Sequence, residues 1–365
     1  MGGQCSDSID ELSNSLGFTC HDAPALLRLN DPFALANWTM PILELTVVVC
    51  AAAALWWSLR RLRRDGDPVN LVLWLVTVVY LLIVEPPLYF PSVFGIEGSL
   101  GAVFVHNVFT VQLLYDRLPL YIVALYPAIT MLAYEIVRGL GVFRDRGLIV
   151  GAVCVGFVHH CLYEVFDQLG PRLDWWTWNT GNAINQPALQ GVPLSSVLLF
   201  ATVGPALATY LVRALVAERS AGGTGVVLRG LAAAVLIPIG LCVINIPIAL
   251  AGFVQTDGPL RTTLYILYLA ACTGVAVPVL LRQWRKPHDS NAFVAVFGPV
   301  YLIVLAVLWT ATMFAGVGLG NLAYAAGSFL VAVAATAAAT VPRSAAALDP
   351  AVALDPATPT DEVSP

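Results

Sequence analysis

Residues 148–167 read LIVGAVCVGFVHHCLYEVFD, and this run decides the fold class because it is apolar over the length at which a helix crosses a bilayer, about 20 residues. Comparable apolar runs recur along the chain, separated by short polar breaks. They cover residues 41–59, 69–90, 118–138, 148–167, 191–212, 229–253, 262–281, 291–314 and 321–341. The sequence therefore predicts an all-α, polytopic helical integral membrane protein with about nine transmembrane helices.

The composition supports the same class. Hydrophobic residues make up 58% of the 365 residues, charged residues 11%, and the mean hydropathy is +0.79, which is outside the range of soluble domains. The main expected partner is the lipid bilayer, and no basic patch points to nucleic acid. Five histidines are too few for a membrane desaturase, and the single lysine, Lys286, lies in a loop, which argues against a retinal Schiff base. The chain is rich in Ala, Val, Leu and Gly, which is the signature of codons high in G and C, so we expect a bacterial plasma membrane.

Basic residues predict the orientation, because cytoplasmic loops of membrane proteins are enriched in them. Fourteen of the 18 fall in alternate loops on one side of the spans. We therefore expect the N-terminus outside and the C-terminus inside. Residues 1–40 would form an extracytoplasmic arm, 41–341 the transmembrane domain, and 342–365 a disordered cytoplasmic tail.

Two details of this topology stay open. Residues 102–115 are apolar but short, so we interpret them as a re-entrant or interfacial segment, with a tenth span as the alternative. Cys5 and Cys20 lie together in the N-terminal arm and could form a disulfide if that arm faces an oxidising exterior.

Three glutamates from three different spans fall at one depth. Counting about 1.5 Å per residue from the cytoplasmic ends places Glu44 roughly 22 Å, Glu85 roughly 24 Å and Glu164 roughly 24 Å along their helices. An ionisable side chain in a span is costly and therefore signals function or a specific partner. The alternative is that these carboxylates lie close enough to the outer interface to reach water.

The span over 148–167 adds more polar groups at that depth. His160, Glu164 and Asp167 share one helix face, while His159 points about 100° away. A histidine one turn from a carboxylate can be a metal-ligand pair, an acid/base pair or a plain hydrogen-bonded pair. Asp167 and Glu135, near span ends, are expected to be solvated.

Glu85 precedes Pro86-Pro87, and a residue before proline is pushed away from helical geometry. We therefore expect the outer third of the 69–90 span to unwind. Unwound backbone at membrane depth survives only where it is buried in protein or lines a cavity, so a cavity is expected near Glu85. His106 follows in the next outer segment and could form its roof.

Three tryptophans follow the same span, at Trp175, Trp176 and Trp178. We interpret them as an aromatic belt at the membrane surface, because Trp is enriched there. A platform that guides an apolar substrate is the alternative.

The tryptophan loop and the helix after it resemble the membrane carotenoid hydratase family. The residues that carry the resemblance are Asp167, Trp176-Thr177-Trp178 and Gly191-Val192-Pro193-Leu194, and Glu85 looks like the family's earlier intramembrane glutamate. The match covers about 30 residues. After Leu194 the family tends to continue with Asn and a Gly-Trp pair, whereas this chain has Ser195-Ser196-Val197. The resemblance implies hydration of an isoprenoid double bond.

Three functions are consistent with these residues. The first is an enzyme acting on an isoprenoid or other apolar lipid by carboxylate chemistry, with Glu85 and Glu164 as acid/base pair, Asp167 and His160 tuning them, and Glu44, His106, His159, Trp175, Trp176 and Trp178 around the pocket. The second is a proton-coupled transporter or flippase that uses the same carboxylates. The third is a metal or haem protein with His106, His159 or His160 as ligands, although we assign no metal ligand and no cofactor. A structural or partner-binding role also remains open.

Overall fold

The computed structural model describes residues 5–20, 24–217, 223–254, 258–314 and 322–343. Within these residues, nine helical spans are long and apolar enough to cross a membrane, which confirms the predicted fold class. They are α2 (Thr39–Asp65), α3 (Val69–Tyr89), α5 (Leu120–Gly139), α6 (Val142–Leu169), the fifth span made of η3 (Ser196–Val203), α7 (Gly204–Val212) and η4 (Arg213–Ala217), α8 (Gly223–Val254), α9 (Pro259–Trp284), α10 (Ala292–Phe314) and α11 (Leu322–Thr340).

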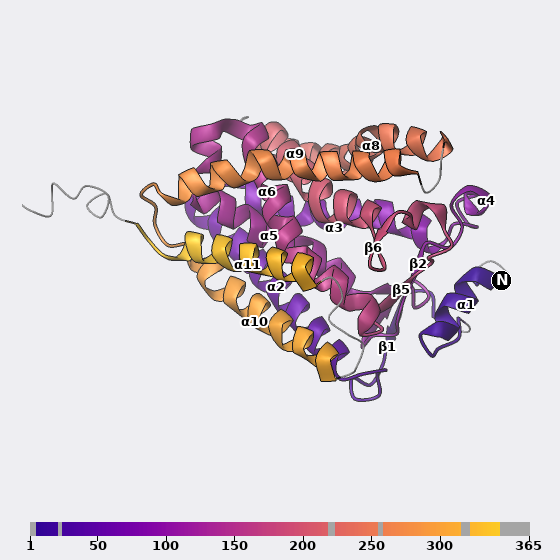
Figure 1. Ribbon diagram of the computed structural model, residues 1–365. Coiled ribbons are helices and arrows are strands. Elements are labelled where there is room, and N and C mark those ends of the chain that lie inside the picture. The colour runs from indigo at the N-terminus through magenta and orange to yellow at the C-terminus, as the bar shows by residue number, and fades with distance from the viewer. Residues whose placement is uncertain (1–4, 21–23, 218–222, 255–257, 315–321, 344–365) are drawn as a thin grey trace, which may run out of the picture.

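Helices α5 and α6 form the centre of the bundle. Figure 1 shows the long helices lying side by side along one common direction. α5 packs against α2, α3 and α6, while α6 also contacts α7, α9 and α11. In the most apolar 18-residue stretch of each helix, 83% of the residues are buried in α5, whereas 28% are buried in α8 and 11% in α9. The outer helices α8 and α9 therefore turn apolar surface towards lipid, and the polar groups of α5 and α6 lie inside.

Short elements gather at one end of the bundle, on the right of Figure 1. They are α1 (Asp7–Ser15), β1 (Leu27–Leu29), α4 (Glu97–Leu100), β2 (Phe104–His106), β3 (Val111–Leu113), β4 (Leu118–Pro119), η1 (Gly170–Arg172), β5 (Trp176–Trp178), η2 (Ala183–Asn185), β6 (Ala188–Leu189) and β7 (Val192–Pro193). We call residues 5–20, 24–38, 90–119 and 170–195 the cap. Residues 102–115 supply β2 and β3 to it, so they form a strand-containing part of the cap and not a tenth span.

Backbone pairing and asparagine side chains hold the cap together. β1, β3 and β4 form one antiparallel sheet, β2 pairs with β5, and β6 pairs with β7. Asn179 donates to the carbonyl of Ala102 at 2.9 Å, and Asn185 donates to that of Val103 at 2.7 Å. Because an asparagine amide can satisfy a loop carbonyl, these residues join the 170–195 loop to the 90–119 segment without regular structure.

The N-terminal arm packs on the cap and is closed by a disulfide between Cys5 and Cys20. Ile9 and Leu16 form a small apolar cluster with Ala102. The predicted tail begins later than expected, because the backbone of Arg343 pairs with His288. The rest of the expected tail, residues 344–365, lies outside the described residues.

The predicted unwinding at Pro86-Pro87 is wrong. α3 stays helical to Tyr89, and the amide of Phe90 donates to the carbonyl of Pro86 at 2.9 Å. The two prolines lie in the last turn, so they remove only two backbone donors. Transmembrane helices tolerate such losses.

Glu135 is also buried rather than solvated, as is Asp167. Its oxygens accept hydrogen bonds from Asn70 at 2.6 Å, from Asn291 at 2.8 Å, and from Arg138 at 2.9 and 2.6 Å. Four charge-assisted bonds from α3, α5 and the start of α10 offset the cost of removing this carboxylate from water. The network therefore joins three helices near one end of the bundle.

We expect Glu135→Leu to lower the free energy of unfolding by about 3 kcal/mol, because it leaves a largely buried guanidinium and two amides without their acceptor. Thermal unfolding of purified protein in a neutral detergent measures the change. Glu11→Leu, at an exposed position of α1, is the matched control and should change stability by less than about 0.5 kcal/mol. Equal effects of the two substitutions would contradict a stabilising role for Glu135.

Candidate functional site

A small cavity of about 30 Å³ lies where α3, α5, α6 and the fifth span meet the cap. A cavity near Glu85 was expected from the sequence, and the structure contains one even though α3 does not unwind. Its lining residues are Glu85, Phe104, His106, Ile122, Tyr126, Tyr163, Phe166, Asp167, Trp176, Trp178, Ser196 and Phe200. Two acidic side chains thus face one space whose walls are mostly aromatic.

Glu85 reaches the cavity from the last turn of α3. The hydroxyl of Tyr126 donates to its Oε1 at 2.7 Å, and Tyr89 lies beside the same carboxyl group. Its other oxygen, Oε2, is buried and has no hydrogen-bond partner among the described residues. One half of this carboxyl group is therefore held by the protein, and the other half remains available for chemistry in the cavity.

Asp167 has the same arrangement on the opposite wall. The hydroxyl of Ser196 donates to its Oδ2 at 2.8 Å, while Oδ1 is buried and makes no hydrogen bond within the described ranges. Asp167 is at the end of α6 and Ser196 begins the fifth span, so this bond also fixes how the two helices meet. Glu85 and Asp167 thus line the same cavity.

Glu164 does not line the cavity. It lies one turn earlier than Asp167 on α6, and its Oε1 is 3.8 Å from Nδ1 of His160. His160 itself is held between the hydroxyls of Thr202 and Tyr324, each at 3.0 Å from a ring nitrogen. The expected face of His160, Glu164 and Asp167 therefore exists as a column behind the cavity, and Asp167 is its only member that the cavity reaches.

Glu44 lies at the cap and has structural partners. Its two carboxylate oxygens accept hydrogen bonds from the backbone amides of Thr110 and Val111, each at 3.0 Å. These bonds tie the loop before β3 to α2. The three glutamates of similar depth therefore do not converge, because only Glu85 lines the cavity.

The histidines considered as ligands are separated. His106 lies in the cavity roof, with its Nδ1 3.3 Å from the hydroxyl of Tyr121, whereas His159 bonds to the carbonyl of Ala201 at 2.7 Å. Within the part of the chain that the structure describes, no three His, Cys, Asp or Glu side chains are grouped as a metal ion would need. The ligand set proposed from the sequence is thus not assembled.

The tryptophans form a roof rather than a surface belt. Trp175 is fully buried, donates from Nε1 to the hydroxyl of Thr39 at 2.9 Å, and stacks on Phe166. Trp176 is 3% exposed and packs so closely on Gly170 that a Cβ there would overlap its ring. Trp178 is half-buried at the edge. The belt interpretation is therefore wrong for Trp175 and Trp176, because both side chains are buried inside the protein.

Sequence reasoning missed the hydroxyl groups that hold the carboxyls. Tyr126 lies inside an apolar span, where a buried phenol generally needs a hydrogen-bond partner, so the sequence contains this signal. Ser196 was noted only as a departure from the family pattern, yet it binds Asp167. Tyr324 comes from α11, beyond the part of the chain that carried the resemblance.

The cap gives one pH-dependent property outside the spans. Burial among aromatic rings lowers the pKa of His106 to about 3. The folded protein thus holds the neutral imidazole, and the unfolded chain binds a proton below a pH of about 6.5. As pH falls from about 6.5 towards 3, this residue should remove up to about 1.4 kcal/mol of stability per pH unit.

Thermal unfolding of wild type and His106→Gln at a series of pH values tests this expectation. Other titrating groups are common to both proteins, so the wild type should lose stability more steeply over that interval. Identical slopes would show that His106 does not stay neutral.

No protein-family model, no curated protein and no solved structure matches this chain. Its function must therefore be argued from the geometry of this cavity.

Proposed function

We propose that this membrane protein is an enzyme that hydrates a carbon–carbon double bond of an isoprenoid or similar apolar lipid. One observation carries the proposal: Glu85 and Asp167 line the same small cavity, and each keeps one buried oxygen without a hydrogen-bond partner in the described part of the chain. Carboxyl pairs of this kind serve as general acid and base.

The chemistry needs two proton transfers. One carboxyl group gives its proton to an alkene carbon, the π bond breaks, and a tertiary carbocation forms. A water oxygen then bonds to the cation, and the other carboxylate accepts the proton that this water releases. The net reaction adds one water, and a proton passing between the two carboxyl groups restores their starting states.

The cavity walls suit this intermediate. Faces of tryptophan and tyrosine attract cations, and Tyr126, Tyr163, Trp176 and Trp178 all line the cavity. A volume of about 30 Å³ is enough for one or two water molecules but not for an isoprenoid chain. The lipid would therefore enter when the loop over 170–195 moves away from the bundle.

The resemblance to the membrane carotenoid hydratases supports the same chemistry, because Glu85, Asp167 and Trp176 are among the residues that carry it. The proposed pair differs from the sequence expectation in one respect. Asp167 takes the role first given to Glu164, which becomes a group behind the site.

A proton-coupled transporter is the second candidate, and the column on α6 is the observation that favours it. Asp167, Glu164 and His160 follow one helix face inward from the cavity. Such a series of titratable groups inside a membrane is typical of proton relays. If the protein is a transporter, Glu164 is essential for proton transfer along this column. If it is a hydratase, Glu164 only supports Asp167.

We also propose that the protein lies in a bacterial plasma membrane, with the cap outside. The end opposite the cap carries Arg60, Arg61, Arg63, Arg64, Arg138, Arg144, Arg146, Arg213, Arg229, Arg282, Arg285, Lys286 and Arg343. We call it the arginine end, and the enrichment of cytoplasmic loops in basic residues supports its cytoplasmic location.

Either Glu85→Gln or Asp167→Asn should abolish a lipid product that wild type forms, with a loss of about 100-fold or more in rate, since each substitution removes one proton-transfer group. The measurement is mass spectrometry of lipids from membranes incubated in isotopically labelled water. A substrate that gains one labelled oxygen and two hydrogens is the expected product.

Glu11→Gln is the matched control and should retain the rate of wild type. Glu164→Gln separates the two candidates, because a transporter should lose proton-driven uptake into vesicles while forming no hydrated lipid. If no lipid gains labelled water with wild-type protein, the hydratase proposal fails.

Orientation is testable with exposed positions at the two ends. We expect Ser99→Cys, in α4 of the cap, to react with a membrane-impermeant maleimide in intact cells. Arg63→Cys, at the arginine end, should react only after permeabilisation. Wild type gives the background of the native cysteines, and the reverse labelling pattern would contradict the proposed topology.

A further inference from the structure

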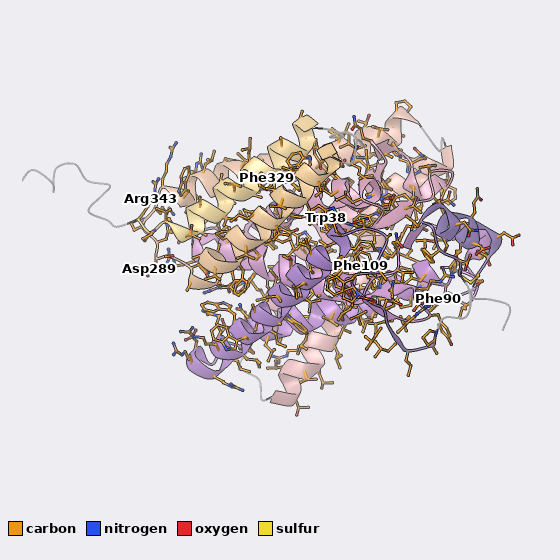
Figure 2. The ribbon with its side chains drawn as sticks, turned by 90° about the horizontal axis from the view of Figure 1, so that it is seen from below. Trp38, Phe90, Phe109, Asp289, Phe329 and Arg343 are labelled. Carbon is orange, nitrogen blue, oxygen red and sulfur yellow. A yellow bond between two sulfur atoms is a disulfide. The ribbon has the colours of Figure 1, made fainter. Side chains whose placement is uncertain are left out.

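A second cavity lies at the arginine end, far from the carboxyl pair. Its volume is about 690 Å³, and four arginines line it: Arg61 of α2, Arg138 of α5, Arg144 of α6, and Arg343 after α11. Figure 2 shows Arg343 and Asp289 close together at this end, on the other side of the molecule from Phe90 of the cap. Three regions far apart in sequence, namely α2, the α5–α6 junction and the segment after α11, thus bring cationic side chains to one space.

The fold holds one wall of this cavity by a short backbone bridge. The amide of Arg343 donates to the carbonyl of His288 at 3.0 Å, and that of His288 to the carbonyl of Arg343 at 3.2 Å. The guanidinium of Arg343 lies over the ring of Trp284 at 5.0 Å. The position of Arg343 at the rim is therefore set by the α9–α10 loop and not by chance contact.

His288 helps to hold this wall in place. Its Nδ1 lies 2.9 Å from the carbonyl of Lys286 and its Nε2 lies 2.7 Å from the carbonyl of Ala338, so the ring connects the α9–α10 loop to the end of α11.

The charge around the cavity favours an anion. Arg61 and Arg138 form ion pairs with Asp67 and Glu135, which do not line the cavity. Among the lining residues, Asp289 is the one carboxylate beside four arginines. The side chain of Arg144 is 75% exposed, and Arg144 and Lys286 both form ion pairs with Asp145. Over the described residues, the arginine end has thirteen basic residues and five carboxylates, so its net charge is positive.

The location favours a lipid head group as the source of that anion. The cavity opens at the ends of membrane-spanning helices, where head groups lie. Trp57 lines it, the neighbouring Trp56 is 58% exposed, and Arg60 lies over both rings at 5.6 Å. Tryptophan and arginine side by side are typical of the interface, and basic pockets between spans bind anionic head groups.

We propose that this cavity binds the phosphate group of an anionic phospholipid. The bound lipid would bridge α2, α5 and the segment around Arg343. The inference does not depend on the proposed hydratase function.

The test measures binding to full-length protein in nanodiscs of phosphatidylcholine. Labelled phosphatidylglycerol is titrated in, with glycerol phosphate and extra phosphatidylcholine as separate arms. We expect saturable binding of phosphatidylglycerol alone. Each of Arg144→Gln and Arg343→Gln should weaken it about fivefold, the effect expected of one basic residue near an anionic head group.

Arg63→Gln is the matched control, because Arg63 is exposed on α2 outside the cavity, and binding should change less than about twofold. Melting of each variant in phosphatidylcholine alone checks folding. Equal binding of glycerol phosphate would show that the site takes soluble phosphates and would overturn the lipid assignment. Absent binding, or equal effects of all three substitutions, would overturn the site.

Discussion

A carboxyl group within a membrane must obtain its hydrogen bonds from the protein, and this constraint organises the whole structure. Glu135 receives four donors from three helices, and both oxygens of Glu44 bind backbone amides. These two groups are fully partnered and hold elements together. Tyr126 donates to one oxygen of Glu85 and Ser196 to one oxygen of Asp167, and both residues line the same cavity. Whether both oxygens of a carboxyl group accept hydrogen bonds thus distinguishes the structural carboxyl groups from the candidate reactive ones.

The cap covers that shared space at one end of the bundle. Without it, bulk water at the membrane surface would solvate both carboxyl groups. Trp175 is anchored to α2 through Thr39, while Asn107 binds the backbone of the same loop. Arg261 of α9 donates to the carbonyl of Ala183 at 2.7 Å. Two helices, α2 and α9, and the 90–119 segment of the cap therefore hold one loop in place.

The sequence predicted the spans well, because apolar length is a property of each segment alone. It also predicted that His160, Glu164 and Asp167 share one helix face, since helical spacing is local. It could not predict which carboxyls meet. Depth along a helix says nothing about rotation, so Glu44 shares a level with Glu85 and yet faces the cap. The burial of Trp176 depends on pairing with residues about 70 positions earlier, which no local pattern reports.

The fifth span shows how a sequence difference can carry chemistry. The helix begins with a π-helical stretch, η3, and wide turns of this kind occur often at functional sites. From that stretch Ser196 binds Asp167, and Thr202 binds His160. Both α6 side chains are therefore oriented from the same element. Ser196 thus supplies a donor to one oxygen of Asp167 and leaves the other without a hydrogen-bond partner among the described residues.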